Sequence, residues 1–394
     1  MRLCAILFWV KEKRSLVSKV DVEFVFVVQG AVEQPQPIQI MLGAGVAQDV
    51  VKTRCCEEKR ARREDVPRKS QVMRKECNNI GEWYFGPSVI ALGGFAKNQG
   101  MTPKWYDRLA NQPLIREVPE IVQSTDLDRL YKNLRKNLSP ADFGRMWGKT
   151  AFQNAPSIWT LSAGSTSFED ILSMGAQLSL LDSNGYVVGL RATNKSVRVN
   201  FYPLLPLPHW QHLMLVQQLA LGFPFLVGDK DLVQRTVVAG EVVPLKTLKS
   251  FEPDPGASSL YASQVVFRRA SLNHQNPVAS QSWALITKSI VDPLIGMRFR
   301  SQPSSYRVSR ALIESYLRGG RLDMVSVAES LHTEKSTLRR HLKSEQSSFS
   351  KILAQFRVQE AKLRLLVGGD LSKISHDLGY EAPMSLQRLI RQFG

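Results

Sequence analysis

The chain has 394 residues, of which 52 are Lys or Arg and 35 are Asp or Glu, and its formal net charge is +17. One hydrophobic core rarely organises a chain of this length, so two or three domains are expected. With 43% hydrophobic and 22% charged residues, the composition excludes a collagen, a disordered chain and a disulfide-stapled miniprotein. The basic excess favours a polyanionic partner without saying which one.

Residues 1–80 differ from the rest of the chain. This segment holds every cysteine of the protein: Cys4, Cys55, Cys56 and Cys77. An oxidised, secreted framework would spread its cysteine pairs through the folded part, so we expect a reducing, cytoplasmic location. A short strand is predicted from Val22 to Val28. The charged tract from Lys52 to Lys75 fits a solvated helix, a disordered segment or a basic arm on nucleic acid. A further hypothesis places the true start of the chain at Met73, which would make residues 1–72 a mis-annotated leader.

No membrane segment is predicted. The apolar run from Leu3 to Val10 has eight residues, whereas about 20 are needed to span a bilayer. No small-residue cleavage site follows that run, as a signal peptide would require. The apolar stretch from Phe201 to Gly228 is broken by Pro203, Pro206 and Pro208 and by several polar residues, which is typical of buried core in a globular domain.

Residues 81–300 predict an α+β domain with its own core. Ser167 and Asp170 have the spacing of a capping box, so a helix should begin after Ser167. Tyr186–Ala192 and Ser196–Tyr202 resemble the two strands of a hairpin. Further helices are expected over Trp210–Leu221, closed by Gly222 and Pro224, and over Ser280–Val291. Pro303 and the serines around it predict a linker to the last segment.

No catalytic or metal-binding set is evident in the sequence. His209 and His212 are three residues apart on a predicted helix, but no third ligand accompanies them, so core or surface histidines are expected. No acid/base pair or nucleophile motif is found either. We therefore predict no enzyme activity, no cofactor and no metal. An enzyme with a basic helical appendage remains an alternative.

Residues 305–394 carry 15 Lys or Arg and 9 Asp or Glu, and their apolar periodicity is helical nearly throughout. Helices are predicted over Tyr306–Leu317, Val325–Leu331, Lys335–Lys343, Phe349–Leu366, Leu371–Leu378 and Pro383–Gln392. The second and third of these helices, and again the last two, are separated only by a short turn. Two helices joined in this way form a helix-turn-helix, so the sequence predicts two such units in tandem.

The two units match in their spacing. Ala328 and Ser375, the small residues where the helices of each unit should cross, are 47 positions apart, and Leu338 and Leu386 are 48 apart. At about 1.5 Å per residue, the helix over 349–366 would be about 27 Å long. That length could hold the two reading helices near one turn of duplex DNA apart, about 34 Å.

The exposed faces of the two reading helices are expected to bind DNA. Guanidinium groups suit guanine edges and phosphates, and the small polar side chains around them can also reach a groove. The candidates are Lys335, Ser336, Thr337, Arg339 and Arg340 on the first helix and Met384, Gln387, Arg388 and Arg391 on the second. A merely solvated face is the alternative for each helix taken alone.

These residues resemble the AraC/XylS family of bacterial transcription regulators over residues 305–394. The resemblance rests on Val327-Ala328-x-x-Leu331, Thr337-Leu338-Arg339-Arg340-x-Leu342, Ser348-Phe349, Arg357-x-x-x-Ala361 and Ile374-x-x-x-Leu378-Gly379-Tyr380. Residues 86–250, through the stretch from Asp142-Phe143-Gly144 to Gly185, also resemble the ligand-sensing half of long members with an arabinose-binding-like N-terminal domain.

The resemblance implies a sequence-specific transcription regulator, with activation as the commoner role in the family. Its implied partners are double-stranded promoter DNA, RNA polymerase, a small-molecule effector and a second copy of the chain. By motif, base reading would fall on Ser336, Arg339 and Arg340 and on Met384, Gln387 and Arg388, with Arg391 nearer phosphate. The chain departs from the family pattern at His332, Glu334 and Ser375. A non-specific architectural DNA-binding protein remains an alternative.

Overall fold

The computed structural model divides the chain into two compact units, Met1–Val72 with Ala110–Pro119 and Met73–Leu109 with Glu120–Gly394. Each unit is considered by itself. The residues that the structure describes are 7–12, 22–27, 83–110, 121–139, 165–183, 185–248, 250–252, 257–272, 276, 292–293, 295–296, 299–300 and 302–393. None of the helices in these ranges is long and apolar enough to cross a membrane.

The first unit contains an antiparallel pair of strands, β1 (Leu7–Glu12) and β2 (Val22–Val27), with Leu7 opposite Val27. The strand predicted from Val22 is confirmed. Its partner was not predicted, because the apolar run before Lys11 was considered only as a signal or membrane segment. The charged tract from Lys52 to Lys75 lies outside the described residues.

A five-stranded antiparallel sheet is the centre of the second unit. Its strands, in spatial order, are β5 (Tyr186–Ala192), β6 (Ser196–Pro203), β11 (Ser263–Arg268), β8 (Val233–Val238) and β9 (Glu241–Val242). The predicted hairpin of β5 and β6 is confirmed. The Thr193 amide donates to the Ser196 carbonyl at 2.8 Å, which closes the turn between them.

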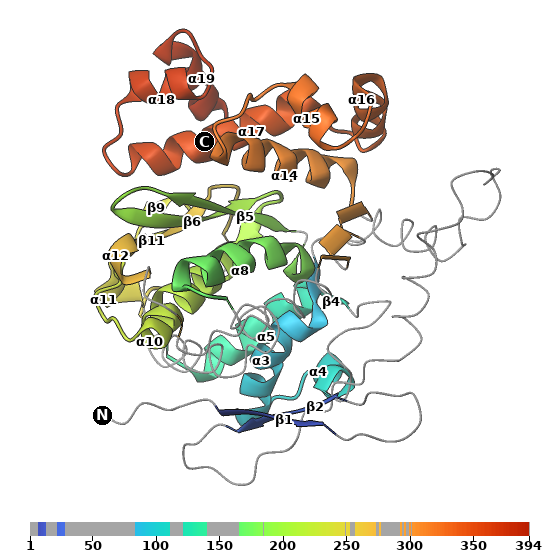
Figure 1. The fold of residues 1–394 in the computed structure, drawn as a ribbon, viewed down its shortest axis with the longest axis vertical. Helices are drawn as coiled ribbons and strands as arrows, with labels where there is room; N and C mark the ends of the chain where they lie inside the picture. Colours follow the sequence, from blue (N-terminus) through green and yellow to red (C-terminus); the bar gives the residue numbers. More distant parts are fainter. Residues whose placement is uncertain are drawn as a thin grey trace, which may run out of the picture. The chain divides into compact units, whose positions relative to one another are not determined.

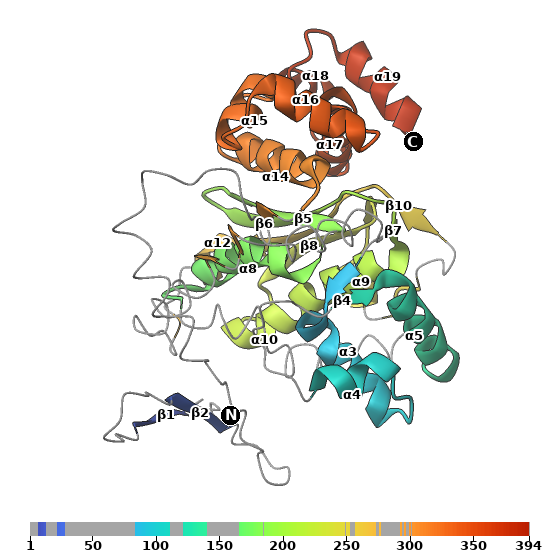
Figure 2. The ribbon, with the colours of Figure 1, turned by 90° about the vertical axis from the view of Figure 1, so that its right-hand side faces the viewer.

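Alternate residues of β6 point to opposite faces of the sheet, which is the period of an extended strand. On one face, Val197, Val199 and Phe201 join a large apolar core. That core also contains residues of α8 (Phe168–Asp182) and α9 (His209–Gln217), which lie on the same side of the sheet; Figure 1 labels α8 there, and Figure 2 labels both. The second unit also contains β3 (Trp83–Phe85), α3 (Gly86–Asn98), α4 (Lys104–Ala110), β4 (Ile121–Gln123), α5 (Ser124–Asn137), β7 (Leu207–Pro208), α11 (Leu245–Leu248) and β10 (Ser258–Ser259).

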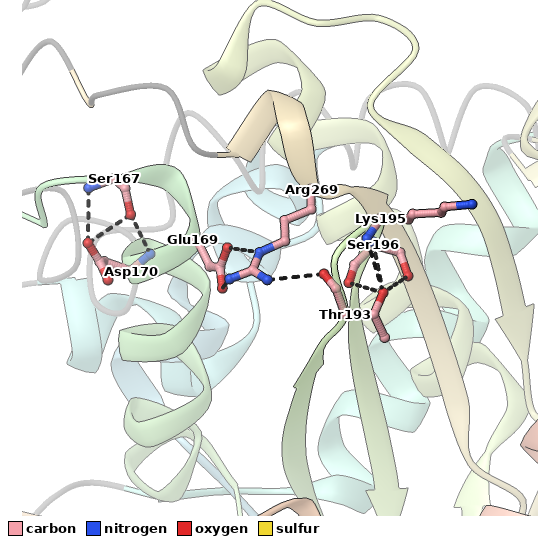
Figure 3. Close-up of polar contacts among 7 residues, drawn as sticks. All are labelled: Ser167, Glu169, Asp170, Thr193, Lys195, Ser196 and Arg269. Carbon is pink, nitrogen blue, oxygen red and sulfur yellow. Dashed lines mark hydrogen bonds and ion pairs between the residues drawn. The ribbon is translucent and has the colours of Figure 1, made fainter.

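The predicted capping box is present at the start of α8 (Figure 3). The Asp170 amide donates to Ser167 Oγ at 3.1 Å, and the Ser167 amide donates to Asp170 Oδ2 at 3.2 Å. Arg269, the first residue of α12 (Arg269–Leu272), donates to both carboxylate oxygens of Glu169, at 3.0 and 3.2 Å, and to the Thr193 carbonyl at 3.1 Å. One guanidinium therefore joins the start of α8 to the turn of the hairpin.

The helix predicted over Trp210–Leu221 continues further than expected. After α9 the chain forms a π-helical turn, η1 (Gln218–Gly222), and then α10 (Phe223–Val227), which ends at Gly228 in the left-handed conformation. The prediction that Gly222 and Pro224 close the helix is wrong. Pro224 lies in the first turn of α10, directly after the π-helical turn, and the first turn of a helix tolerates a proline, which has no amide hydrogen to donate. The helix predicted over Ser280–Val291 lies outside the described residues.

Residues 302–393 contain six helices, in agreement with the six predicted. They are α14 (Ser304–Leu317), α15 (Met324–Ser330), α16 (Lys335–Ser344), α17 (Phe349–Leu365), α18 (Leu371–Asp377) and α19 (Pro383–Phe393). The linker expected around Pro303 stays a prediction, since Pro303 is the residue directly before α14 and most of the residues from 273 to 301 lie outside the described part of the chain. The amides of Ser304 and Ser305 donate to the Glu345 carboxylate at 2.7 and 2.8 Å, which caps this helix.

The second face of the sheet is covered by α14 and α17 (Figures 1 and 2). Val187, Tyr202 and Val237 of the sheet share one apolar cluster with Leu312 and Phe356 of these helices. The sheet is therefore a middle layer, with α8 and α9 on one face and α14 and α17 on the other.

Candidate nucleic-acid interface

The predicted reading surface is built from two helix pairs, α15 with α16 and α18 with α19. Both pairs begin with an aspartate that caps a seven-residue helix. Asp323 accepts hydrogen bonds from the amides of Val325 and Ser326, at 2.8 and 2.9 Å, and Asp370 accepts from the amide of Lys373 at 2.8 Å. The two aspartates are 47 positions apart, as are the two small residues that the sequence aligned.

The turn inside each pair has the same hydrogen bonding. The Thr333 amide donates to the Ala328 carbonyl at 3.0 Å, and the Tyr380 amide donates to the Ser375 carbonyl at the same distance. Both turns need a left-handed residue, which is His332 at φ 49° in the first and Gly379 at φ 79° in the second. Glycine adopts this conformation without strain, whereas a histidine does so at a cost. The sequence departure at His332 is therefore accommodated without a change in the turn.

The helices of each pair cross at a buried small residue. Ala328 in the first pair and Ser375 in the second are both almost fully buried. Leu338 and Leu342 fill the first crossing, and Leu386 lies in the second. The Ser375 hydroxyl donates to the Ala382 carbonyl at 3.3 Å, so a serine can occupy a position where alanine is usual.

The predicted site residues lie on the outer faces of α16 and α19. Thr337 and Gln387 are half-buried, and the other seven are exposed: Lys335, Ser336, Arg339, Arg340, Met384, Arg388 and Arg391. Met384 is 64% exposed, which is unusual for so large an apolar side chain. Within the described part of the chain, the arginines of this set make no hydrogen bond or ion pair.

The second helices of the two pairs, α16 and α19, differ in their number of basic residues. Helix α16 carries Lys335, Arg339, Arg340 and Lys343 and no acidic residue, whereas α19 carries only Arg388 and Arg391. Glu334, the residue before α16, makes no capping hydrogen bond with its side chain. Because α16 has no carboxylate among its own residues, its outer face offers four free positive charges to a polyanion.

Sequence reasoning missed the polar face of α17, which the structure buries against the sheet. Gln359 donates to the carbonyls of Pro203 and Leu260, both at 2.7 Å, and Gln355 donates to the Pro203 carbonyl at 3.1 Å. Glutamines on a helix usually face solvent, so the sequence holds no signal for these contacts.

Glu360 is the centre of this buried contact. The hydroxyl of Tyr202 on β6 donates to one carboxylate oxygen at 2.8 Å, and the hydroxyl of Tyr316 on α14 donates to the other at 3.0 Å. Burial raises the pKa of Glu360, and the hydrogen bonds from the two tyrosines only partly oppose that shift. Burial and the Glu360 charge raise the pKa of Tyr316 to about 12, so this tyrosine remains a donor at neutral pH.

The same network reaches the second helix pair. Arg364 on α17 donates to the Tyr316 hydroxyl at 3.4 Å and to the Asp377 carboxylate on α18 at 2.6 Å. The Arg357 guanidinium lies over the ring of Tyr380, 4.5 Å from its centre, in the turn between α18 and α19. A chain of polar contacts therefore runs from the sheet through α17 to the second pair.

One of the two histidines considered as metal ligands, His212, makes hydrogen bonds within the sheet domain. His212 is buried between the Ser263 hydroxyl at 2.9 Å and the Ser259 carbonyl at 3.2 Å. Burial lowers its pKa to about 4, so it is neutral at pH 7. Among the described residues, no three side chains of the metal-binding types gather in one place.

Comparison with protein-family models and with curated proteins gives no match. Among solved structures, the transcriptional regulator CdpR from Pseudomonas aeruginosa is similar, at 16% sequence identity and a TM-score of 0.35. The similarity covers 77% of this chain and 93% of that chain.

Proposed function

We propose that this chain is a sequence-specific, DNA-binding transcription regulator of the AraC/XylS type. In this proposal, an α+β sensing domain over residues 81–300 is followed by an all-α domain over 305–394 with two helix-turn-helix units. The supporting observation is the repetition of one arrangement: capped helix, left-handed turn, and a second helix with exposed arginines that have no partner within the described residues.

The two helices would divide the work on DNA. Lysine and arginine contacts to phosphates supply affinity that falls as salt rises, because binding releases counterions. Discrimination between bases comes from side chains that reach the major-groove edges, for which Arg339, Arg340 and Arg388 are the candidates. Exposed Met384 at the start of α19 could pack against a thymine methyl group.

Finer parts of the proposal rest on the family resemblance alone. They are activation through RNA polymerase, control by a small-molecule effector, binding as a homodimer, and a cytoplasmic location. The packing of α14 and α17 on the sheet supplies a physical route for such control, since a change in the sheet would move the helices that hold both pairs.

Binding-site selection from random DNA tests the proposal. We expect the wild-type chain to enrich a defined motif. Arg339→Ala and Arg388→Ala should each cost about 1–3 kcal/mol in binding to that motif and relax selection at one base pair. Arg129→Ala, which removes an exposed arginine of α5, is the matched control and should leave both affinity and motif unchanged.

Two results would count against this reading. An unchanged motif with both α16 and α19 variants would remove those side chains from base recognition. Equal affinity of the wild-type chain for the enriched site and for random DNA, at two salt concentrations, would indicate a non-specific architectural protein instead.

A further inference from the structure

Three arginines form a row on the face of the sheet that carries α14 and α17. Arg191 of β5 is paired with Arg198 of β6, Arg198 with Val266 of β11, and Val266 with Arg235 of β8. Paired residues of neighbouring strands point to the same face, so all three guanidinium groups leave the sheet on one side. We call Arg191, Arg198 and Arg235 the arginine row.

The arginine row has few acceptors. Arg235 donates to the Gln264 side chain at 2.8 Å, and Arg191 donates to the Tyr316 hydroxyl at 3.4 Å. The Nε atoms of Arg198 and Arg235 are buried and have no hydrogen-bond partner. Within the residues that the structure describes, no carboxylate forms an ion pair with any of the three.

This arrangement is costly for a sheet by itself. Like charges on directly opposite cross-strand positions are destabilising, and so is a buried donor without an acceptor. Burial and, after it, the charge of Arg198 lower the pKa of Arg235. Glu360 lies near Arg191, but its two oxygens already accept from Tyr202 and Tyr316. A bound anion would offset the repulsion between the guanidinium groups and would supply the acceptors that the arginine row lacks.

We propose that the arginine row is a binding site for a small multivalent anion, a metabolite bearing several carboxylates or a phosphate. Planar guanidinium groups hold such oxygens in pairs, which favours these ligands over chloride. The position next to Tyr316 places the anion beside the contact between α14, α17 and the sheet. A role as the effector of transcription rests on the proposed function, whereas binding of the anion does not.

Calorimetric titration and thermal unfolding of the full chain, with no DNA present, test the site. The probes are citrate and inorganic phosphate, each compared with sodium chloride at equal ionic strength. We expect at least one of the two to bind and to raise the unfolding temperature. Arg198→Gln and Arg235→Gln should each weaken that binding at least about tenfold, since each removes one charge-assisted contact. The matched control, Arg129→Gln at an exposed position of α5, should bind the anion as the wild type does.

Urea unfolding without anion shows whether a variant that loses anion binding is still stably folded. Because substitution relieves repulsion, Arg198→Gln should unfold at the same urea concentration as the wild type or a higher one. A clear loss of stability would show that the guanidinium serves the fold and would overturn the proposal. An equal response of wild type and variants to citrate and phosphate, or no response beyond that to chloride, would also overturn it.

DNA measurements separate this proposal from the proposed function. Loss of DNA affinity in Arg198→Gln with no anion binding in the wild type would assign the row to DNA phosphates and overturn the anion site. Anion binding that persists while the chain shows no DNA binding would leave the anion site standing and contradict the proposed function.

Discussion

A single carboxylate, Glu360, occupies the contact between the helices and the sheet. Its two oxygens accept from tyrosines that belong to different elements, β6 and α14. Asn200 donates to the Tyr202 hydroxyl at 2.7 Å and accepts from Gln264 at 2.8 Å, so the polar network extends into the middle of the sheet. Such a buried network is stable only if every member keeps its partner.

The raised pKa of Glu360 predicts how stability depends on pH. A carboxyl group whose pKa is higher in the folded state favours folding in its protonated form, so its contribution is largest at acidic pH and is lost as pH rises through the folded-state pKa. Glu360→Gln keeps a hydrogen-bonding side chain but cannot ionise. The stability of this variant relative to wild type should therefore increase between about pH 4 and pH 8, measured by urea unfolding.

Two further variants complete this measurement. Glu360→Ala leaves two buried tyrosine hydroxyls without their acceptor, at about 1–3 kcal/mol for each group. Glu329→Gln, at an exposed position of α15, is the matched control for the loss of one carboxylate. A Glu360→Gln variant whose relative stability stays flat or falls with rising pH would contradict the buried, pKa-shifted carboxyl.

At the scale of elements, helix starts are controlled by carboxylates in two different ways. Asp323 and Asp370 cap their own helices from the adjacent position, a pattern that the sequence displays. Glu345 caps α14 from 40 residues away, which only the fold can bring about. Glu334 precedes α16 directly, yet its side chain caps nothing.

These two glutamates give a matched comparison. Glu345→Ala should destabilise the chain by about 1–2 kcal/mol, because two amides at the start of α14 lose a charged acceptor. Glu334→Ala should change the free energy of unfolding by less than about 0.5 kcal/mol. Urea unfolding of both variants measures the difference. Equal effects, or a larger effect at Glu334, would mean that the capping of α14 contributes little to stability.

In the second unit as a whole, each of the two faces of the sheet packs against helices and forms a hydrophobic core with them. Gly189 on β5 lies under the end of α14, where an added Cβ atom would be 2.9 Å from both Leu317 and Tyr202 side-chain atoms. Glycine is required at this point by the close approach of helix and strand, and not by backbone conformation. The contact of α14 with the sheet therefore depends on a missing side chain.

Substitution of this glycine tests the contact. Gly189→Ala should lower the free energy of unfolding by about 1–3 kcal/mol, as expected for overpacking of a filled core. Limited proteolysis should also cut more readily near residues 302–304, where α14 begins. Gly296→Ala, where the added atom meets nothing closer than 3.8 Å, is the control. Unchanged stability of Gly189→Ala would show that α14 and the sheet pack less closely than described.

The sequence by itself determined the local elements. Apolar periodicity, capping residues and turn glycines predicted all six helices of residues 302–393, the capping box at Ser167 and the β5–β6 hairpin. The sequence also identified the candidate DNA-reading residues. On a short helix, the apolar positions show which face must be buried, and the polar side chains on the opposite face are then the exposed ones. Such signals lie within a few residues of one another in the chain, where the geometry of helix and strand is fixed.

Only the tertiary structure decided what joins these elements. The burial of Glu360 and Gln359 and the remote cap by Glu345 depend on segments 40 to about 160 residues apart, and the alignment of the arginine row depends on the pairing of four strands. It also overturned the helix end at Pro224. In each of these cases the same residue has two uses that local sequence cannot distinguish: a proline can start a helix or break one, and a polar residue can face solvent or a buried partner.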